Sequence, residues 1–166
     1  MVLTFSEEIS KDSIDHLIEK LSSVEEDLIL YFSTIGGCVI SSEALLTYLN
    51  VYKKDTLTII FTADVCSMGA YIMFNFAGKK FLSETLDVVL IHTIDRQAYN
   101  NRLTKLDRIL DESLKKLSVK YFDRMSKHFK FTKKEKKKYF SGKDIVLTPQ
   151  DFHRINIPFW NIEDTF

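Results

Sequence analysis

The chain has 166 residues, of which 45% are hydrophobic, and 23 basic residues balance 23 acidic ones. This length suits one domain with a sizeable core, and the zero net charge removes a whole-protein electrostatic case for binding nucleic acid. The start lacks the basic and long apolar regions of a signal peptide, and no apolar run reaches the length of a membrane span. Two cysteines form no disulfide framework and no zinc-site spacing. We therefore expect a cytoplasmic protein without a cofactor, a metal or a membrane partner.

Apolar runs and helical periodicities alternate over the first 95 residues. The runs predict buried strands, and apolar residues at intervals of three and four predict helix faces. The expected strands are 2–5, 28–32, 57–61 and 88–92, and the expected helices between them are 13–21, 42–52 and 71–76. This order predicts an α/β fold with a mostly parallel sheet.

The pattern from about Gln97 to His128 is helical throughout, with a leucine stripe that includes Leu103, Leu106 and Leu110. A helix of about thirty residues spans roughly 45 Å. That length exceeds a compact domain of this size, so we expect part of the helix to project or to pack on another subunit.

The last forty residues contain shorter signals. Thr132 and Glu135 have the spacing of a capping box that begins a helix, Ile145 to Leu147 form a short apolar run, and Thr148-Pro149 begins a final helical turn. We treat 1–166 as a single domain. Its expected parts are an α/β core (1–95), the long helix with the helix after it (96–140), and a strand with an aromatic tail (141–166).

The segment Cys66-Ser67-Met68-Gly69-Ala70 lies between the strand 57–61 and the helix 71–76. A strand-turn-helix junction exposes its turn residue and leaves helix N–H groups unpaired, so a serine there lies at the positive end of a helix. The simpler interpretation is that Ser67 only caps the helix.

Two other features follow buried strands, namely Gly36-Gly37 and His92. In an open α/β sheet the carboxyl ends of strands are where ligands bind. A nucleophilic serine needs a base to remove its proton, a carboxylate to orient that base, and backbone N–H groups for the oxyanion. The Gly-Gly turn lets a substrate approach main-chain donors closely.

These motifs resemble the proteolytic subunit of the Clp protease, within the wider Clp/crotonase superfamily. Cys66 to Ala70 is similar to the family's Ala-Ser-Met-Gly-Ala nucleophile motif. Val88 to His92 is similar to its Val-Met-Ile-His, and Gly36 to Val39 to its Gly-Gly-Ser-Val. Gly142 to Thr148 resembles the segment that brings the third triad member.

The resemblance implies a β-β-α superhelix with a handle-like long helix, and roles for five residues. Ser67 would be the nucleophile, His92 the general base and acid, and Asp144 the carboxylate that orients His92. The N–H groups of Gly37 and Met68 would form the oxyanion hole. Asp95, three residues past His92, is the alternative to Asp144.

The family implies a serine endopeptidase that acts on peptides or unfolded proteins, a homo-oligomeric ring, and an ATP-dependent unfoldase as a candidate partner. After His92 the family has a Gly-rich strand beside the contact between rings, whereas this chain enters the helical pattern almost directly. We therefore expect a single ring or a smaller assembly. Two alternatives stay open: a catalytically inactive structural or regulatory subunit, and an acyl-CoA enzyme of the crotonase branch.

Overall fold

A five-stranded sheet in the order β1-β2-β3-β4-β5 forms the centre of the computed structural model, which describes residues 1–94 and 105–161. The first four strands pair in parallel, and the edge strand β5 runs antiparallel to β4. The strands are β1 (Val2–Phe5), β2 (Leu28–Thr34), β3 (Leu57–Cys66), β4 (Lys79–Ile91) and β5 (Ile145–Leu147). The predicted α/β class with a mostly parallel sheet is confirmed.

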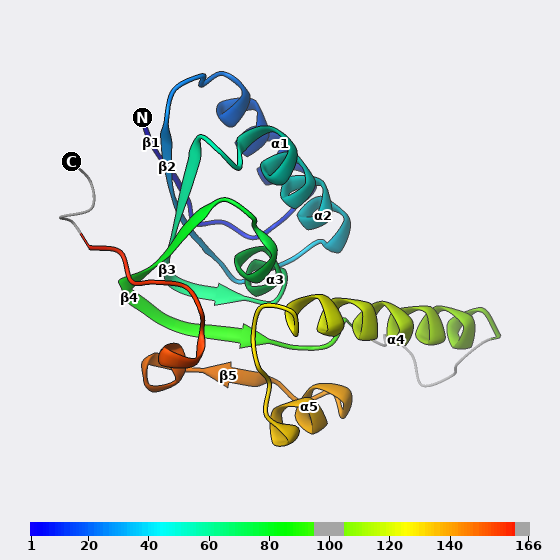
Figure 1. Ribbon diagram of the computed structural model, residues 1–166. Helices are drawn as coiled ribbons and strands as arrows, with labels where there is room; N and C mark the ends of the chain where they lie inside the picture. The colour runs from blue at the N-terminus through cyan, green and yellow to red at the C-terminus, as the bar shows by residue number, and fades with distance from the viewer. Residues whose placement is uncertain (95–104, 162–166) are drawn as a thin grey trace.

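Helices connect the parallel strands, as such crossovers require. Figure 1 shows α1, α2 and α3 gathered on one side of the strands, while α4 extends away from the sheet. The helices are α1 (Lys11–Ser22), α2 (Val39–Tyr48) with a following π-helical turn η1 (Leu49–Lys53), α3 (Met68–Asn75), α4 (Lys105–Met125) and α5 (Lys133–Phe140), with a 3₁₀ turn η2 (Pro149–Arg154). The capping box of Thr132 and Glu135 begins α5 as predicted.

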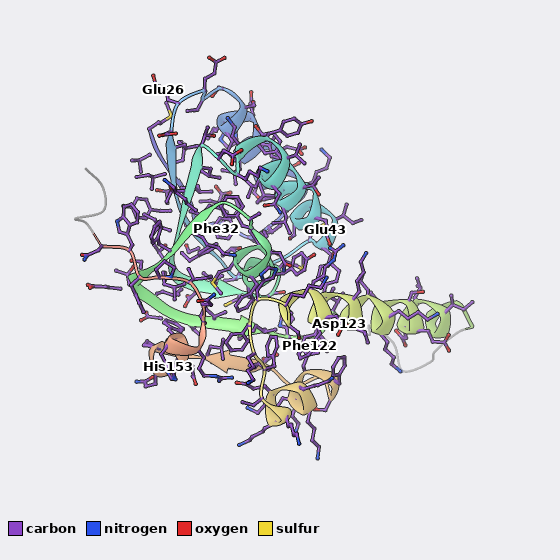
Figure 2. The ribbon with its side chains drawn as sticks, in the orientation of Figure 1. Glu26, Phe32, Glu43, Phe122, Asp123 and His153 are labelled. Carbon is purple, nitrogen blue, oxygen red and sulfur yellow. The ribbon has the colours of Figure 1, made fainter. Side chains whose placement is uncertain are left out.

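The core lies between the sheet and these helices. In β2 the fully buried residues Leu28, Leu30 and Phe32 alternate with half-buried ones, as expected for a pleated strand with one face on the core. The Phe32 ring stacks on Phe5 at a centroid distance of 5.2 Å and meets Phe61 edge-on, and Figure 2 labels Phe32 in the middle of the molecule. Neighbouring strands thus share one aromatic layer.

Strands β3 and β4 are longer than the apolar runs that predicted them. β3 continues past Phe61 to Cys66, and its last residues pair with the end of β4, with Cys66 opposite Leu90. The register shifts near Ala63, which has a positive φ of 49°, as expected where a bulge bends a strand. Exposed polar residues such as Asp64 interrupt the apolar pattern there, so strand pairing rather than hydrophobicity sets these boundaries.

Helix α4 has two differently covered halves. Its last turns bury Tyr121, Phe122 and Met125, each at most 4% exposed, whereas Ile109 and Leu110 are 53% and 41% exposed. Its 21 residues span about 32 Å, and the half that begins at Lys105 lies farthest from the sheet in Figure 1. Of the predicted leucine stripe, Leu103 and the side chain of Leu106 fall outside the described residues.

Within residues 1–94 and 105–161, no helix is both long enough and apolar enough to cross a membrane.

Candidate active site

Ser67 lies on the turn between β3 and α3 in a conformation that L-residues rarely adopt, with φ 56° and ψ −120°. Its N–H donates to the carbonyl of Leu90 at 2.7 Å. Although Ser67 is the N-cap residue of α3, its hydroxyl does not cap the helix. Instead Oγ lies 2.8 Å from Nε2 of His92. Strained backbone of this kind costs about 1–3 kcal/mol and gathers at functional sites, so the simple capping interpretation does not describe this serine.

The register of β3 and β4 explains why Ser67 and His92 meet. Cys66 pairs with Leu90 in parallel, so the residues that follow the two strands leave the sheet side by side. Ser67 is the next residue after β3, and His92 follows the last residue of β4. The sheet therefore joins two side chains 25 residues apart in sequence.

Asp144 reaches the same histidine from the edge strand. Ile91 pairs with Ile145 in the antiparallel ladder of β4 and β5, which puts Asp144 opposite His92. Asp144 Oδ1 lies 3.7 Å from His92 Nδ1, and the two side chains are 53% and 42% exposed. This distance exceeds a hydrogen bond, although catalytic contacts are often loose without substrate. Asp95 lies outside the described residues.

The Gly36-Gly37 turn approaches Ser67 so closely that only glycine fits. Both glycines have positive φ, and a Cβ on Gly36 would lie 2.5 Å from the Cβ of Ser67. Ile9 bonds the chain on both sides of Gly37, since its N–H donates to Gly36 and its carbonyl accepts from Cys38, each at 2.7 Å. Gly37 faces Ile9 in an isolated parallel bridge, in which the two bonds of Ile9 go to the neighbours of Gly37, so the N–H of Gly37 itself points away from Ile9.

The N–H groups of Gly37 and Met68 donate to no other protein group among the described residues. Met68 is the first residue of α3, where backbone N–H groups lack helical partners and the helix dipole favours negative charge. The structure thus brings together Ser67, His92, Asp144 and two available donors.

Thr34, which the sequence analysis missed, fixes the glycine turn. Its hydroxyl donates to the Glu7 carbonyl at 2.7 Å and accepts from the Gly36 N–H at 3.0 Å, and the side chain is buried. A lone threonine at a strand end gives no sequence signal for this role, because its two partners come from a distant loop and from its own turn.

A second missed group is centred on Glu43 of α2, labelled in Figure 2. One oxygen of this carboxylate accepts from the hydroxyls of Tyr71 and Tyr121 and from the guanidinium of Arg124. Burial raises the pKa of both tyrosines above the usual value, so their hydroxyls are protonated donors at neutral pH. Both tyrosines lie in helical stretches rich in apolar residues, which give no signal for this shared carboxylate.

Among the residues that the structure describes, no three His, Cys, Asp or Glu side chains gather as metal ligands. Comparison with protein-family models gave no match, and comparison with curated proteins gave none either.

Proposed function

We propose that this chain is a serine peptidase that hydrolyses peptide bonds through Ser67, His92 and Asp144. The single observation that supports it most is the contact of 2.8 Å between Ser67 Oγ and His92 Nε2. The strained turn presents this serine, and the N–H groups of Gly37 and Met68 have no acceptor among the described residues; both features match what acyl transfer needs.

Each residue has one part in the proposed reaction. Ser67 Oγ attacks the peptide carbonyl while its proton passes to His92 Nε2. His92 then gives that proton to the leaving amine as the C–N bond breaks, which leaves an acyl group on Ser67. Water, deprotonated by His92, hydrolyses this ester in the same manner. Asp144 faces the other ring nitrogen, where its charge stabilises the imidazolium.

The Gly37 and Met68 N–H groups would bind the oxyanion of each tetrahedral intermediate. Such donors are worth most when they are positioned before the reaction. Ile9 and Thr34 fix the glycine turn, and α3 fixes Met68. A side chain at Gly36 would displace Ser67 itself.

The resemblance to the Clp protease proteolytic subunit extends the proposal to architecture and partners. The strands and helices would form the family's β-β-α superhelix, with α4 as the handle. The exposed half of α4, with Ile109 and Leu110, would contact another copy in a homo-oligomeric ring. Unfolded protein would be the substrate, an ATP-dependent unfoldase a candidate partner, and the cytoplasm the location.

A catalytically inactive subunit is the second candidate. Two observations favour it: the 3.7 Å between His92 and Asp144, and the small volume beside Ser67, about 20 Å³. An inactive member would keep the fold and assembly without turnover.

Hydrolysis of an unfolded, fluorescently labelled polypeptide separates the two candidates. The peptidase account predicts a steady rise in free amino termini with the wild type and none with Ser67→Ala. Ser126→Ala, which removes a hydroxyl that donates to the Phe122 carbonyl in the last turn of α4, is the matched control and should keep the rate. Equal rates for the wild type and Ser67→Ala would contradict the proposal.

A further inference from the structure

A small cavity lies against the Ser67–His92 pair. Its volume is about 20 Å³, which is room for about one water molecule. Its walls come from three sources: the nucleophile turn with α3, the end of β4, and α4 with α5. The lining residues are Ser67, Met68, Tyr71, Ile91, His92, Ile94, Tyr121, Met125 and Tyr139.

The rings of Tyr71 and Tyr121 occupy part of the wall of this small cavity. Tyr71 comes from α3 and Tyr121 from α4, their ring centroids are 4.3 Å apart, and they are 2% and 4% exposed. Rings packed this closely across two helices cannot both turn aside without disturbing the helices that carry them.

Hydrogen bonds from their hydroxyl groups to Glu43 hold the two rings in place. Glu43 Oε1 accepts from Tyr121 at 2.6 Å, from Tyr71 at 3.1 Å and from Arg124 Nη1 at 3.0 Å, and Arg124 also donates to the Tyr71 hydroxyl. A carboxylate that accepts several bonds, one of them from a guanidinium, makes strong contacts. The narrow cavity is therefore a fixed feature rather than a chance arrangement of two side chains.

We propose that Tyr71 and Tyr121, anchored by Glu43, restrict this peptidase to cleavage after residues with very small side chains, glycine and alanine. The inference rests on the proposed function. Ser67, Met68 and His92 themselves line the cavity. A substrate whose carbonyl oxygen lies on the N–H groups of Gly37 and Met68, with its leaving group facing His92, would therefore place the side chain of its acyl residue at this cavity. A methyl group is comparable in size to the water that fits there, whereas a leucine side chain is not.

The p-nitrophenyl esters of N-acetylglycine, N-acetylalanine and N-acetylleucine test this directly. Ser67 Oγ bonds to the ester carbonyl, p-nitrophenolate leaves, and water releases the N-acetyl amino acid. One methylene in an apolar pocket changes kcat/KM by about tenfold or more. The wild type should therefore hydrolyse the alanine ester at least about tenfold better than the leucine ester, after subtraction of the Ser67→Ala background.

Tyr121→Ala enlarges the cavity and should raise kcat/KM for the leucine ester by about tenfold or more. Tyr121→Phe keeps the ring but removes its bond to Glu43, so it should keep only part of the preference for alanine. Tyr52→Ala, at a tyrosine 70% exposed, is the matched control and should change neither ester.

A wild type that prefers the leucine ester, or treats both alike, overturns the restriction even if Tyr121→Ala fails to fold. A folded Tyr121→Ala that gains nothing on the leucine ester overturns the role of Tyr121. If no ester is hydrolysed above the Ser67→Ala background and no fluorophosphonate reacts with Ser67, the proposed function fails and the restriction fails with it. If a fluorophosphonate labels Ser67 but the enzyme does not prefer the alanine ester, the proposed function stands and only the restriction to small residues fails.

Discussion

Strands β2 and β3 and helix α4 all carry apolar residues, but the two strands leave no large apolar side chain exposed, whereas α4 exposes several. Leu30, Phe32 and Phe61 are fully buried, whereas α4 buries Tyr121 and Phe122 and exposes Ile109 and Leu110. Residues near the end of α4 thus complete the core between the sheet and its helices, and none of the described side chains of the other half, residues 109–115, belongs to that core.

The residues of the candidate active site and the surface proposed for assembly therefore lie in different parts of the fold. Ser67 and His92 are positioned by the register of β3 on β4, which needs only the sheet. Asp144 depends on the C-terminal segment that carries β5. The exposed half of α4 is available to a second subunit, since large exposed apolar patches mark interaction sites. Substitutions in the three places should therefore have different consequences.

The largest effect is expected at the sheet-borne pair. His92→Ala removes the base that takes the Ser67 proton, and loss of such a residue lowers kcat by about 10⁴- to 10⁶-fold. The melting temperature should change little, because His92 is 42% exposed. His153→Ala, at another exposed histidine, is the control. Activity retained in His92→Ala would contradict the assigned role.

Asp144→Asn tests the contribution of the C-terminal segment to the site. Replacing a triad aspartate by asparagine costs up to about 10⁴-fold. The looser contact of 3.7 Å to His92 leads us to expect a loss of about 10²- to 10⁴-fold in kcat/KM. Asp123→Asn, on the exposed side of α4, should be neutral. A loss of less than twofold would transfer the role to another carboxylate, and Asp95 is the first to test.

The two halves of α4 should respond differently to truncation. Phe122 is 3% exposed and meets the rings of Phe131, Tyr139 and Phe140, at the position labelled in Figure 2. Phe122→Ala should lower the free energy of unfolding by about 3–5 kcal/mol in urea titrations. Ile109→Ala in the projecting half, at a residue 53% exposed, should cost less than about 1 kcal/mol. Similar losses for both would remove the distinction between the halves.

The ion pair of Glu135 and Arg154 links α5, which precedes β5 in the chain, to η2, which follows it. The guanidinium bonds both carboxylate oxygens, at 2.8 and 2.7 Å, and lowers the pKa of Glu135 to about 2. Because the folded pKa lies below the unfolded one, this stabilisation is complete above about pH 4.5 and is lost as the pH falls through about 2.

At about 1.4 kcal/mol per pKa unit, the shift from 4.5 to about 2 corresponds to at most about 3.5 kcal/mol. Solvent screens a pair near the surface, so Glu135→Gln should cost about 2 kcal/mol at pH 7. The difference from the wild type should shrink when unfolding is measured between pH 4.5 and 2. Glu112→Gln, at an exposed glutamate, is the control. A difference that is constant over this pH range would show that the pair does not act through its charge.

The smallest effect on the folded chain is expected at the projecting half of α4. Leu110→Asp, at a residue 41% exposed, should change the free energy of unfolding of the isolated chain by about 0.5 kcal/mol or less. It should lower the sedimentation coefficient of the assembly, because a charge at an apolar interface is costly. Unchanged sedimentation of an oligomeric wild type would place its interface elsewhere, and a monomeric wild type would refute the ring.

Local patterns predicted the elements well where apolar residues repeat without interruption. The alternation of strands and helices, the capping box at Thr132 and the strand Ile145–Leu147 were all readable from the sequence. The lengths of β3 and β4 were not, because the bulge at Ala63 and the polar residues around it are stabilised by pairing between strands.

The candidate site likewise contains residues that the sequence could predict and residues that it could not. Ser67, His92 and the glycine turn lie in short motifs, so the sequence could propose them together. Thr34 and Glu43 could not be found, because each acts through partners brought together only by folding. The positive φ of Ser67 was likewise invisible, since a serine at a helix start reads first as a cap.

Reaction with a fluorophosphonate tests the central claim most directly, because only a serine activated by a neighbouring base attacks this reagent readily. Intact mass and peptide mapping should show one adduct per chain, on Ser67, with labelling strongly slowed in His92→Ala and absent in Ser67→Ala. An unlabelled wild type, or undiminished labelling of Ser67→Ala, would contradict the account.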